Sequence, residues 1–273
     1  MTKYFITGAT GFIGQHLRER LKGNVYLYNR DQPLDCLLSF KPDYIFHLAA
    51  EIYKESEMMD SNILLTQQLL EYSRKLPKLK AFVAIGSSSE YGRKDHPMTE
   101  EDYLDPTTMY EATKGAATLL CQAYARTYGV PVMIARPFSV YGLHEPKKRF
   151  IPTVIKNVRS KRPISLAPGV HDFIHVDDFI DGLLLLADNP LPGEIFNFGS
   201  GVQTTNRELV TTVETLLNKK AHINPIAQLH TYDSDHWVAD SSKAISLGWK
   251  PKYSLTTGLQ QVIENISLER DYF

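Results

Sequence analysis

The chain has 273 residues, 43% of them hydrophobic, and its 30 basic and 31 acidic residues leave a formal net charge of -1. This length and composition predict a sizeable core in one large domain or two unequal lobes, and the balanced charge argues against a protein that binds nucleic acid through a basic surface. The longest apolar runs, such as 183–187, are far too short to cross a bilayer, and nothing at the start resembles a signal peptide, so no membrane partner is expected.

The first predicted elements form a strand, a glycine turn and a helix. Residues 3–7 are a short β-rich run, the glycine turn 8–14 follows at once, and the helical pattern of 15–22 ends at Gly23. In such a turn one glycine reverses the backbone, one leaves room for a pyrophosphate and one lets the helix pack on the strand. Exposed amides and the helix dipole then bind the phosphates. This order predicts a dinucleotide-binding domain.

The next strand is expected at 25–28, and the residue at its carboxyl end normally faces the adenosine ribose. An acid there bonds the 2'-hydroxyl and repels a 2'-phosphate, whereas a neutral residue followed by arginine accepts that phosphate. The chain has Asn29 and Arg30, which favours NADP(H). NAD(H) remains an alternative because Asp31 follows, and Arg30 is alternatively a solvated surface charge.

The middle of the chain continues the alternation of strands and helices. Before the buried run 44–48 there is room for only a short helix around 34–40, so the usual third strand is expected to be missing. A helix at 62–71 should cover the sheet, and the apolar run 81–85 predicts a central parallel strand. The sequence Gly-Ser-Ser-Ser-Glu-Tyr-Gly at 86–92 follows that strand, where α/β sheets bind their ligands.

Tyr110 and Lys114 are neighbours at i and i+4 on the helix expected at 109–128. An ammonium beside a phenol favours the phenolate and lowers a pKa that starts near ~10. Such a tyrosine can exchange a proton with a substrate alcohol or carbonyl at neutral pH. The alternative is a surface tyrosine packed on a lysine stem.

The glycine turn, the serine loop and the Tyr-x-x-x-Lys pair together resemble the extended short-chain dehydrogenase/reductase family, in its branch of nucleotide-sugar epimerases, dehydratases and 4-ketoreductases. The resemblance covers nearly the whole chain. Further matching segments are His-Leu-Ala-Ala at 47–50, Asn62, Arg-Pro-Phe-Ser-Val-Tyr-Gly at 136–142, Asp-Phe-Ile-His-Val-Asp-Asp at 172–178, Asn-Phe-Gly-Ser-Gly at 197–201, and the tail 239–251.

The resemblance implies a role for each matching residue. Tyr110 would be the general acid/base, Lys114 would lower its pKa and bond the nicotinamide ribose, and Ser87 would bond the reacting oxygen, with Ser88 as the fallback. Asn62 would be structural, and no metal is implied. The implied cofactor contacts are Gly8, Gly11, Phe12, Ile13, Gly14, Asn29, Arg30, Leu48, Ala49, Ala50, Tyr110 and Lys114, and the implied substrate contacts are Ser88, Ser139, Arg149 and His171.

The serine loop also bears on the reaction. Dehydratases of this branch usually carry an acid just after the catalytic serine or threonine, where this chain has Ser88 and Ser89; Glu90 could serve if the loop is displaced by one residue. Reduction or epimerisation is therefore expected before elimination, and the cofactor preference favours a 4-ketoreductase. The alternatives are a 4-epimerase, then a dehydratase, then a reductase of a smaller carbonyl compound. A protein of a different class, an inactive NAD(P)-sensing regulator, would not need the tyrosine and lysine.

The substrate half departs from the family pattern. His171 stands where relatives commonly have arginine before Asp-Phe, and a second arginine expected near 235–237 is not evident. Both usually bind the nucleotide diphosphate. The cations at 147–149 could replace them, or they form a solvated basic loop.

The expected architecture is a doubly wound, mostly parallel sheet of α/β class. Residues 1–142, completed by about 171–200, would form the Rossmann domain, with strands at 134–140 and 194–198 returning to the sheet. Residues 143–170 and 201–273 would form a smaller substrate-binding lobe, with the substrate between the two.

The expected partners are a nucleotide-sugar substrate and a second copy of the chain. By resemblance, helices at 62–74 and 109–128 would form a homodimer interface. Cys36 and Cys121 stand at unrelated positions, so neither a disulfide framework nor a zinc site is expected, and a cytoplasmic location fits best.

Overall fold

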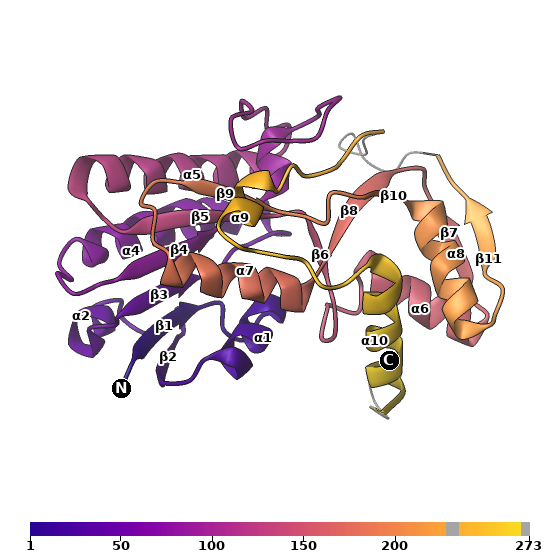
Figure 1. Cartoon of the computed structure of the whole chain (residues 1–273), viewed down its shortest axis with the longest axis horizontal. Coiled ribbons are helices and arrows are strands. Elements are labelled where there is room, and N and C mark those ends of the chain that lie inside the picture. Colours follow the sequence, from indigo (N-terminus) through magenta and orange to yellow (C-terminus); the bar gives the residue numbers. More distant parts are fainter. Residues whose placement is uncertain (228–234, 269–273) are drawn as a thin grey trace.

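The computed structural model describes residues 1–227 and 235–268. Its centre is a six-stranded parallel sheet with the strand order β2-β1-β3-β4-β5-β9 (Figure 1). The apolar run predicted as a central strand forms β4, and four of its five residues are buried because both faces of the sheet are covered. The six strands are β1 (Lys3–Thr7), β2 (Asn24–Tyr28), β3 (Tyr44–His47), β4 (Ala81–Ile85), β5 (Val132–Pro137) and β9 (Ile195–Phe198).

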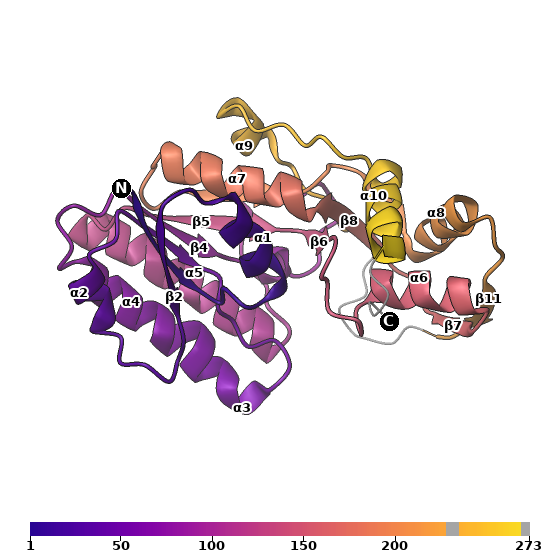
Figure 2. The ribbon, with the colours of Figure 1, turned by 90° about the horizontal axis from the view of Figure 1, so that it is seen from below.

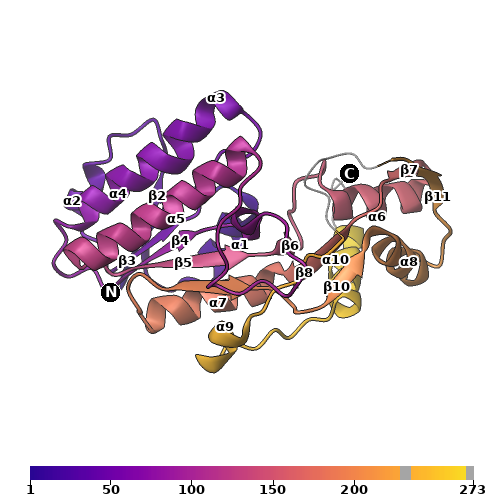
Figure 3. The same cartoon turned by 90° about the horizontal axis from the view of Figure 1, so that it is seen from above.

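Helices cover both faces of this sheet, as the predicted doubly wound fold requires (Figure 2 and Figure 3). One face packs against the helices α1 and α7, whose apolar side chains share a core with β1, β4, β5 and β9. The opposite face packs against α2, α4 and α5. The bounds are α1 (Phe12–Arg20), α2 (Cys36–Phe40), α4 (Leu65–Ser73), α5 (Met109–Tyr128) and α7 (Val176–Asp188).

The edge of the sheet confirms that the usual third strand is missing. β2 is the edge strand and pairs only with β1, while β3 lies on the other side of β1. Within the fully described segment 29–43, α2 is the one regular element. The chain therefore reaches the central strands with a shorter connection than a full Rossmann half would need.

Several predicted helix boundaries differ from the observed ones. α1 begins at Phe12 rather than residue 15, because the extended Gly11 is its N-cap residue, and it ends at Arg20. The helix predicted at 62–71 is longer and mixed: α3 (Glu55–Met58) leads through a π-helical turn (Met59–Leu64) into α4. By contrast α5 has the predicted bounds, since Thr108 and Glu111 form a capping box and Gly129 closes the helix at φ 67°.

The strand predicted at 134–140 is split in two. β5 ends at Pro137, which has no amide hydrogen for the ladder, and the Phe138 amide instead donates to the Phe198 carbonyl at 2.9 Å. The chain then leaves the large sheet and pairs in a second sheet with the order β10-β8-β6. These strands are β6 (Ser139–Tyr141), β8 (Val170–His175) and β10 (Gln203–Thr205).

The smaller lobe lies beyond this second sheet (Figure 1). Its core comes from α6, α8 and α10, with Val154, Val213 and Leu259 fully buried or nearly so. Glu208 and Thr205 form the capping box that starts α8, one residue before its predicted start. The elements are α6 (Phe150–Ser160), α8 (Asn206–Leu217), α10 (Leu255–Leu268), β7 (Pro163–Leu166) and β11 (His222–Pro225).

The tail between the lobes returns to the large sheet. The helix α9 (Ser242–Ser246) packs against β9, and Trp249 lies in the core shared with α7. Trp249 donates its indole N–H to the Asp178 carbonyl at 2.9 Å. This part of 201–273 therefore packs with the large sheet rather than with the smaller lobe.

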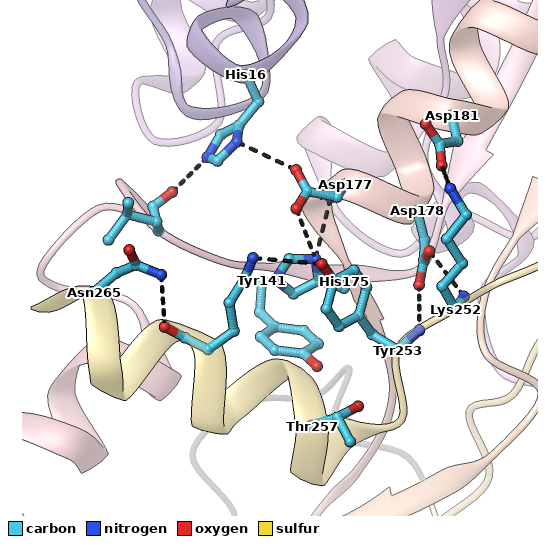
Figure 4. Close-up of polar contacts among 12 residues, drawn as sticks. His16, Tyr141, His175, Asp177, Asp178, Asp181, Lys252, Tyr253, Thr257 and Asn265 are labelled. Carbon is cyan, nitrogen blue, oxygen red and sulfur yellow. Dashed lines mark hydrogen bonds and ion pairs between the residues drawn. The ribbon is translucent and has the colours of Figure 1, made fainter. Parts of the chain in front are cut away.

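Two aspartates of the segment 172–178 tie distant parts of the chain together. Asp172 accepts the amides of Ser200, Gly201 and Ala239 at 2.6, 3.0 and 3.0 Å. Asp178 accepts the amides of Lys252 and Tyr253 at 2.9 and 3.0 Å (Figure 4). Burial raises the pKa of both carboxyls. Both aspartates belong to the motif 172–178, and each accepts hydrogen bonds from backbone amides that have no partner in a neighbouring strand.

The lobes also meet through His16 of α1 (Figure 4). Its Nε2 lies 2.7 Å from the Leu143 carbonyl, and its Nδ1 lies 3.7 Å from Asp177 Oδ1. Asp177 in turn lies 3.7 Å from the buried His175, over which the Tyr253 ring packs. The helix that follows the glycine turn is thus in direct contact with the segment that enters the smaller lobe.

Candidate active site

A cleft of about 390 Å³ opens beyond the carboxyl ends of β4 and β5 and is closed on its other side by the smaller lobe. Ligands of open α/β sheets bind at this edge. The structure brings many predicted site residues to its wall, namely Ile13, Leu48, Ala50, Ser87, Ser88, Tyr110, Lys114, Ser139, Arg149 and His171.

The glycine turn lies next to this cleft and has no room for larger residues. Gly8 has φ +70°, and a Cβ on it would lie 2.7 Å from the Ala49 amide nitrogen. A Cβ on Gly14 would lie 2.2 Å from the Gly8 carbonyl oxygen. α1 has no acid in its first turn and no side-chain cap, so the amides of that turn are available to an anion. The turn fits the pyrophosphate of a dinucleotide.

Ser87 stands where the chain leaves β4 and turns. It is the N-cap residue of a 3₁₀ turn, Ser88–Tyr91, and its Oγ lies 2.7 Å from Ser89 Oγ. It also acts to lower the pKa of the Tyr110 hydroxyl, which is partly buried beside it in the same cleft. The serine and the tyrosine therefore meet at one point of the cleft, although they come from different elements.

The main influences on the pKa of Tyr110 come from groups other than Lys114. Burial raises the pKa of Tyr110, while the hydrogen bond with Ser87 and the charge of Arg149 act in the opposite direction. The Lys114 ammonium donates instead to the Ile85 carbonyl at the end of β4, and burial lowers the pKa of Lys114. That Lys114 lowers the pKa of Tyr110 stays a prediction, since in this structure the ammonium bonds the end of the strand.

Glu90 is not available to a substrate. Its side chain is fully buried and pairs with Arg136, whose Nη2 and Nε lie 2.8 and 2.9 Å from Glu90 Oε2. Thr118 also donates to Oε2 at 2.8 Å, and Glu90 Oε1 accepts the Ser87 amide at 2.7 Å. The alternative that Glu90 serves as the acid of an elimination is therefore wrong, since both of its carboxylate oxygens are bonded within the protein.

The described lining of the cleft contains one carboxylate, that of Glu111. It accepts the amides of Thr107 and Thr108 at 2.6 and 3.0 Å as part of the α5 cap. A carboxylate in that role is committed to the helix end. No free acid therefore faces Ser87 in the described part of the wall.

The opposite wall comes mainly from the smaller lobe and its connections. Ser139 Oγ lies 3.3 Å from His171 Nδ1, and Arg149 projects from the start of α6. Trp237 also lines the cleft and packs edge-on against Phe138 at 6.5 Å between ring centres. Sequence reasoning missed Trp237 because it looked near 235–237 only for an arginine.

Comparison with known proteins adds to this geometry. The model of the NAD dependent epimerase/dehydratase family matches residues 24–199, more than half of the chain. The chain belongs to this family. The identification agrees with the resemblance found in the sequence, although the matched range begins after the glycine turn.

Individual relatives within the NAD-dependent epimerase/dehydratase family differ in reaction. A dTDP-glucose 4,6-dehydratase of Haemophilus influenzae is 29% identical over 82% of this chain and 76% of its own. The uncharacterised UDP-glucose epimerase YtcB of Bacillus subtilis is 28% identical over 97% of this chain and 98% of its own. The solved UDP-glucuronic acid 4-epimerase of Bacillus cereus, in complex with UDP-glucuronic acid and NAD, is 25% identical, with a TM-score of 0.88 over 98% of this chain and 99% of that one.

In this family member, some predicted cofactor residues lie outside the cleft wall. Asn29 and Arg30 are exposed at the end of β2, where Asn29 donates to Asp31 at 3.2 Å. The charge of Arg30 nevertheless reaches the carboxyl edge of the sheet, since burial, Lys114 and then Arg30 lower the pKa of His47 to about 3. The other predicted residues that do not line the wall are Gly8, Gly11, Phe12, Gly14 and Ala49, all at or beside the glycine turn.

The described residues, 1–227 and 235–268, contain neither a cluster of metal ligands nor a membrane-spanning helix. No group of three or more His, Cys, Asp and Glu side chains is arranged to hold a metal ion within these ranges. Over the same residues, no helix is long and apolar enough to span a membrane.

Proposed function

We propose that this family member is a nucleotide-sugar 4-ketoreductase that favours NADP(H) over NAD(H). One observation carries the choice of reaction: Ser87, Tyr110 and Lys114 meet in the cleft, while the only acid of the serine loop, Glu90, is buried in an ion pair with Arg136. An enzyme that eliminates water from a sugar needs a group to remove a proton from carbon. The described cleft wall offers no free carboxylate for that step.

The described residues suit the delivery of a proton to a carbonyl oxygen. When bound, the dinucleotide supplies the hydride. Burial raises the pKa of Tyr110, so its phenol is held protonated and is suited to be a proton donor. Ser87 lies beside that phenol in the cleft and would hold the same substrate oxygen. Lys114, fixed by the Ile85 carbonyl, would bond the nicotinamide ribose.

The proposed cofactor site extends from the glycine turn to the end of β2. The backbone of the turn would hold the pyrophosphate, and Ala49 and Ala50 would leave space for the dinucleotide. Asn29 and Arg30 support the preference for NADP(H), because a neutral residue followed by a cation accepts a 2'-phosphate. The residues assigned to the site are Gly8, Gly11, Phe12, Ile13, Gly14, Asn29, Arg30, Leu48, Ala49, Ala50, Tyr110 and Lys114.

The proposed substrate site lies on the opposite wall. Ser88, Ser139, Arg149 and His171 would bind the nucleotide sugar, with Arg149 as the cation for its diphosphate. Charge-assisted hydrogen bonds to phosphate are among the stronger polar interactions available to a protein. In this assignment Arg149, at the start of α6, takes the place of the two arginines that bind the diphosphate in relatives.

A 4-epimerase that retains NAD is the second candidate. It is favoured by the likeness to the Bacillus cereus UDP-glucuronic acid 4-epimerase, which extends over 98% of this chain. The same serine, tyrosine and lysine would serve both reactions, since each needs proton exchange at the C4 oxygen. An inactive cofactor sensor is the less favoured alternative, because a sensor needs no buried tyrosine beside the bound dinucleotide.

A panel of 4-keto-6-deoxy nucleotide sugars with NADPH or NADH tests the proposal. A reductase would consume the reduced cofactor in proportion to product, measured as loss of absorbance, and faster with NADPH. Product formed without net consumption of cofactor would contradict the reductase and support the epimerase. Formation of a 4-keto-6-deoxy sugar from a 4-hydroxy nucleotide sugar would contradict the argument from Glu90.

A further inference from the structure

Arg149 is held at the cleft wall by a buried acid. Its Nε lies 3.1 Å from Glu145 Oε1, and the Glu145 side chain is 4% exposed against 40% for that of Arg149. Glu145 therefore lies in the interior of the protein, while its partner Arg149 lies at the surface of the cleft.

The Glu145 carboxylate is poorly compensated for a buried charge. Its Oε2 is buried without a hydrogen-bond partner among the described residues. Leaving a charge in that state costs stability, and an apolar side chain of similar size would avoid the cost. Stability alone does not explain why an acid stands at this position. A role in holding Arg149 does explain it.

Arg149 is also the cation that reaches the reacting end of the cleft. Its charge acts to lower the pKa of Tyr110, which places the guanidinium near the phenol. The other Lys or Arg side chain in the described lining is Lys114, which bonds the Ile85 carbonyl. An anionic substrate group entering from the side of the smaller lobe would therefore meet Arg149.

We propose that Glu145 is a positioning residue whose carboxylate keeps the Arg149 guanidinium at the cleft wall, where it binds the diphosphate of a nucleotide sugar. Protonation of Glu145 releases Arg149 and weakens that binding. The inference rests on the proposed function, since it gives the substrate a diphosphate. It adds a pH-dependent control of substrate affinity by a residue that does not touch the substrate.

The surroundings of Glu145 determine the pH range. Burial raises its pKa to about 7, while Arg149 and the Gly142 backbone act to lower it. Tyr141 of β6 also interacts with Glu145, and burial raises the pKa of that phenol, so it stays neutral. Glu145 is thus charged above about pH 7 and neutral below it. Substrate affinity should fall as the pH falls through this value.

Calorimetric binding of UDP-glucose and dTDP-glucose to the full chain at pH 6 and pH 8 tests the inference. Their diphosphates are diesters and keep their charge over this range. Wild-type affinity should fall by up to about tenfold from pH 8 to pH 6, the size of one charge-assisted hydrogen bond. Glu145→Gln should bind weakly at both pH values, with no pH dependence. Arg149→Gln should do the same, and the double variant should lose no more than either single one.

Arg162→Gln is the control, because Arg162 is an exposed cation just after α6 that does not line the cleft. It should bind as the wild type does at both pH values. Thermal melting of each variant checks that the fold is kept, and Arg149→Gln, at a partly exposed side chain, serves if Glu145→Gln does not fold.

Three outcomes would overturn the inference. Wild-type pH dependence in Glu145→Gln would show that the carboxylate does not control binding, and additive losses for the two substitutions would show that Glu145 does not act through Arg149. Failure of the wild type to bind either nucleotide sugar at pH 8 would remove the diphosphate contact. None of these outcomes concerns turnover, so the cofactor-consumption assay still decides the proposed function on its own.

Discussion

Tyr110 is partly buried beside Ser87 and near Arg149, and burial raises its pKa, so the phenol keeps its proton at neutral pH. Its position on α5 could be predicted because the Tyr-x-x-x-Lys spacing and the helix caps are local features. The direction of the Lys114 ammonium could not. It depends on where β4 ends, and that is decided by the sheet rather than by the helix.

Replacing Tyr110 with phenylalanine should lower turnover by about 10²–10⁴-fold, the usual contribution of a positioned proton donor. Cofactor affinity should change little, since the ring remains. Turnover is measured with the reactive member of the nucleotide-sugar panel, and affinity by fluorescence titration with NADPH. Tyr103→Phe is the control, because Tyr103 is 70% exposed. Wild-type turnover in Tyr110→Phe would refute the proton-transfer role.

Among other residues of the cleft, those in short motifs could be predicted and those brought in from a distance could not. Ser87 follows the predicted strand 81–85, and Ser139 lies within the predicted strand 134–140. Trp237 lies in a connection with no periodic pattern, and its amide is held by Gln203 Oε1 at 2.9 Å. Gln203 and Trp237 are far apart in the sequence, and no motif or spacing predicts that they form a hydrogen bond in the folded chain.

At the scale of elements, the strands and helices with continuous apolar patterns were predicted well. The division of 134–140 into β5 and β6 was missed because both pieces are apolar and buried, so their pattern does not change at Pro137. What changes is the partner strand. The missing third strand, by contrast, could be predicted, because a short connection leaves no room for it.

The serine loop depends on the ion pair beneath it. Glu90→Gln keeps the shape of the side chain but leaves the Arg136 charge, 1% exposed, without its carboxylate. Breaking a buried pair in this way should lower the free energy of unfolding by about 3–5 kcal/mol, measured by urea denaturation.

Lys54→Gln is the control for that measurement, since Lys54 and Glu57 form an exposed pair with side chains 67% and 45% exposed. Its loss should leave the free energy of unfolding almost unchanged, because an exposed ion pair contributes little to stability. Equal effects of Glu90→Gln and Lys54→Gln would show that the loop does not depend on the buried pair.

At the scale of the whole molecule, α5 and the π-helical turn that leads into α4 carry exposed apolar side chains. Leu64, Leu119 and Tyr128 are 48%, 58% and 50% exposed. We infer that this face forms the homodimer expected from the family resemblance, because burying such side chains is favourable by roughly 25 cal/mol per Å² of apolar surface.

Leu119→Asp should therefore shift the chain from dimer to monomer, measured by light scattering during size-exclusion chromatography. A buried unpaired carboxylate at the interface would oppose association. Ile245→Asp on α9, at an equally exposed apolar residue of another surface, should leave the dimer unchanged. A monomeric wild type, or a Leu119→Asp variant that stays dimeric, would contradict this interface.

The division into two lobes was predicted from sequence order, but the course of the tail was not. Its contacts depend on Asp172 and Asp178, which accept amides from segments far along the chain. The partners of a carboxylate that accepts backbone amides cannot be predicted from the sequence, since every residue except proline has an amide hydrogen to donate.

The return of α9 and Trp249 to the large sheet limits how the protein can be re-engineered. A chimera that takes its last seventy or so residues from a relative to acquire a new sugar preference would also replace side chains in the core of the large sheet. Such a graft would have to carry matching partners for Asp178 and for the face of α7. Specificity is therefore better altered by point changes at the cleft wall than by exchange of the C-terminal part.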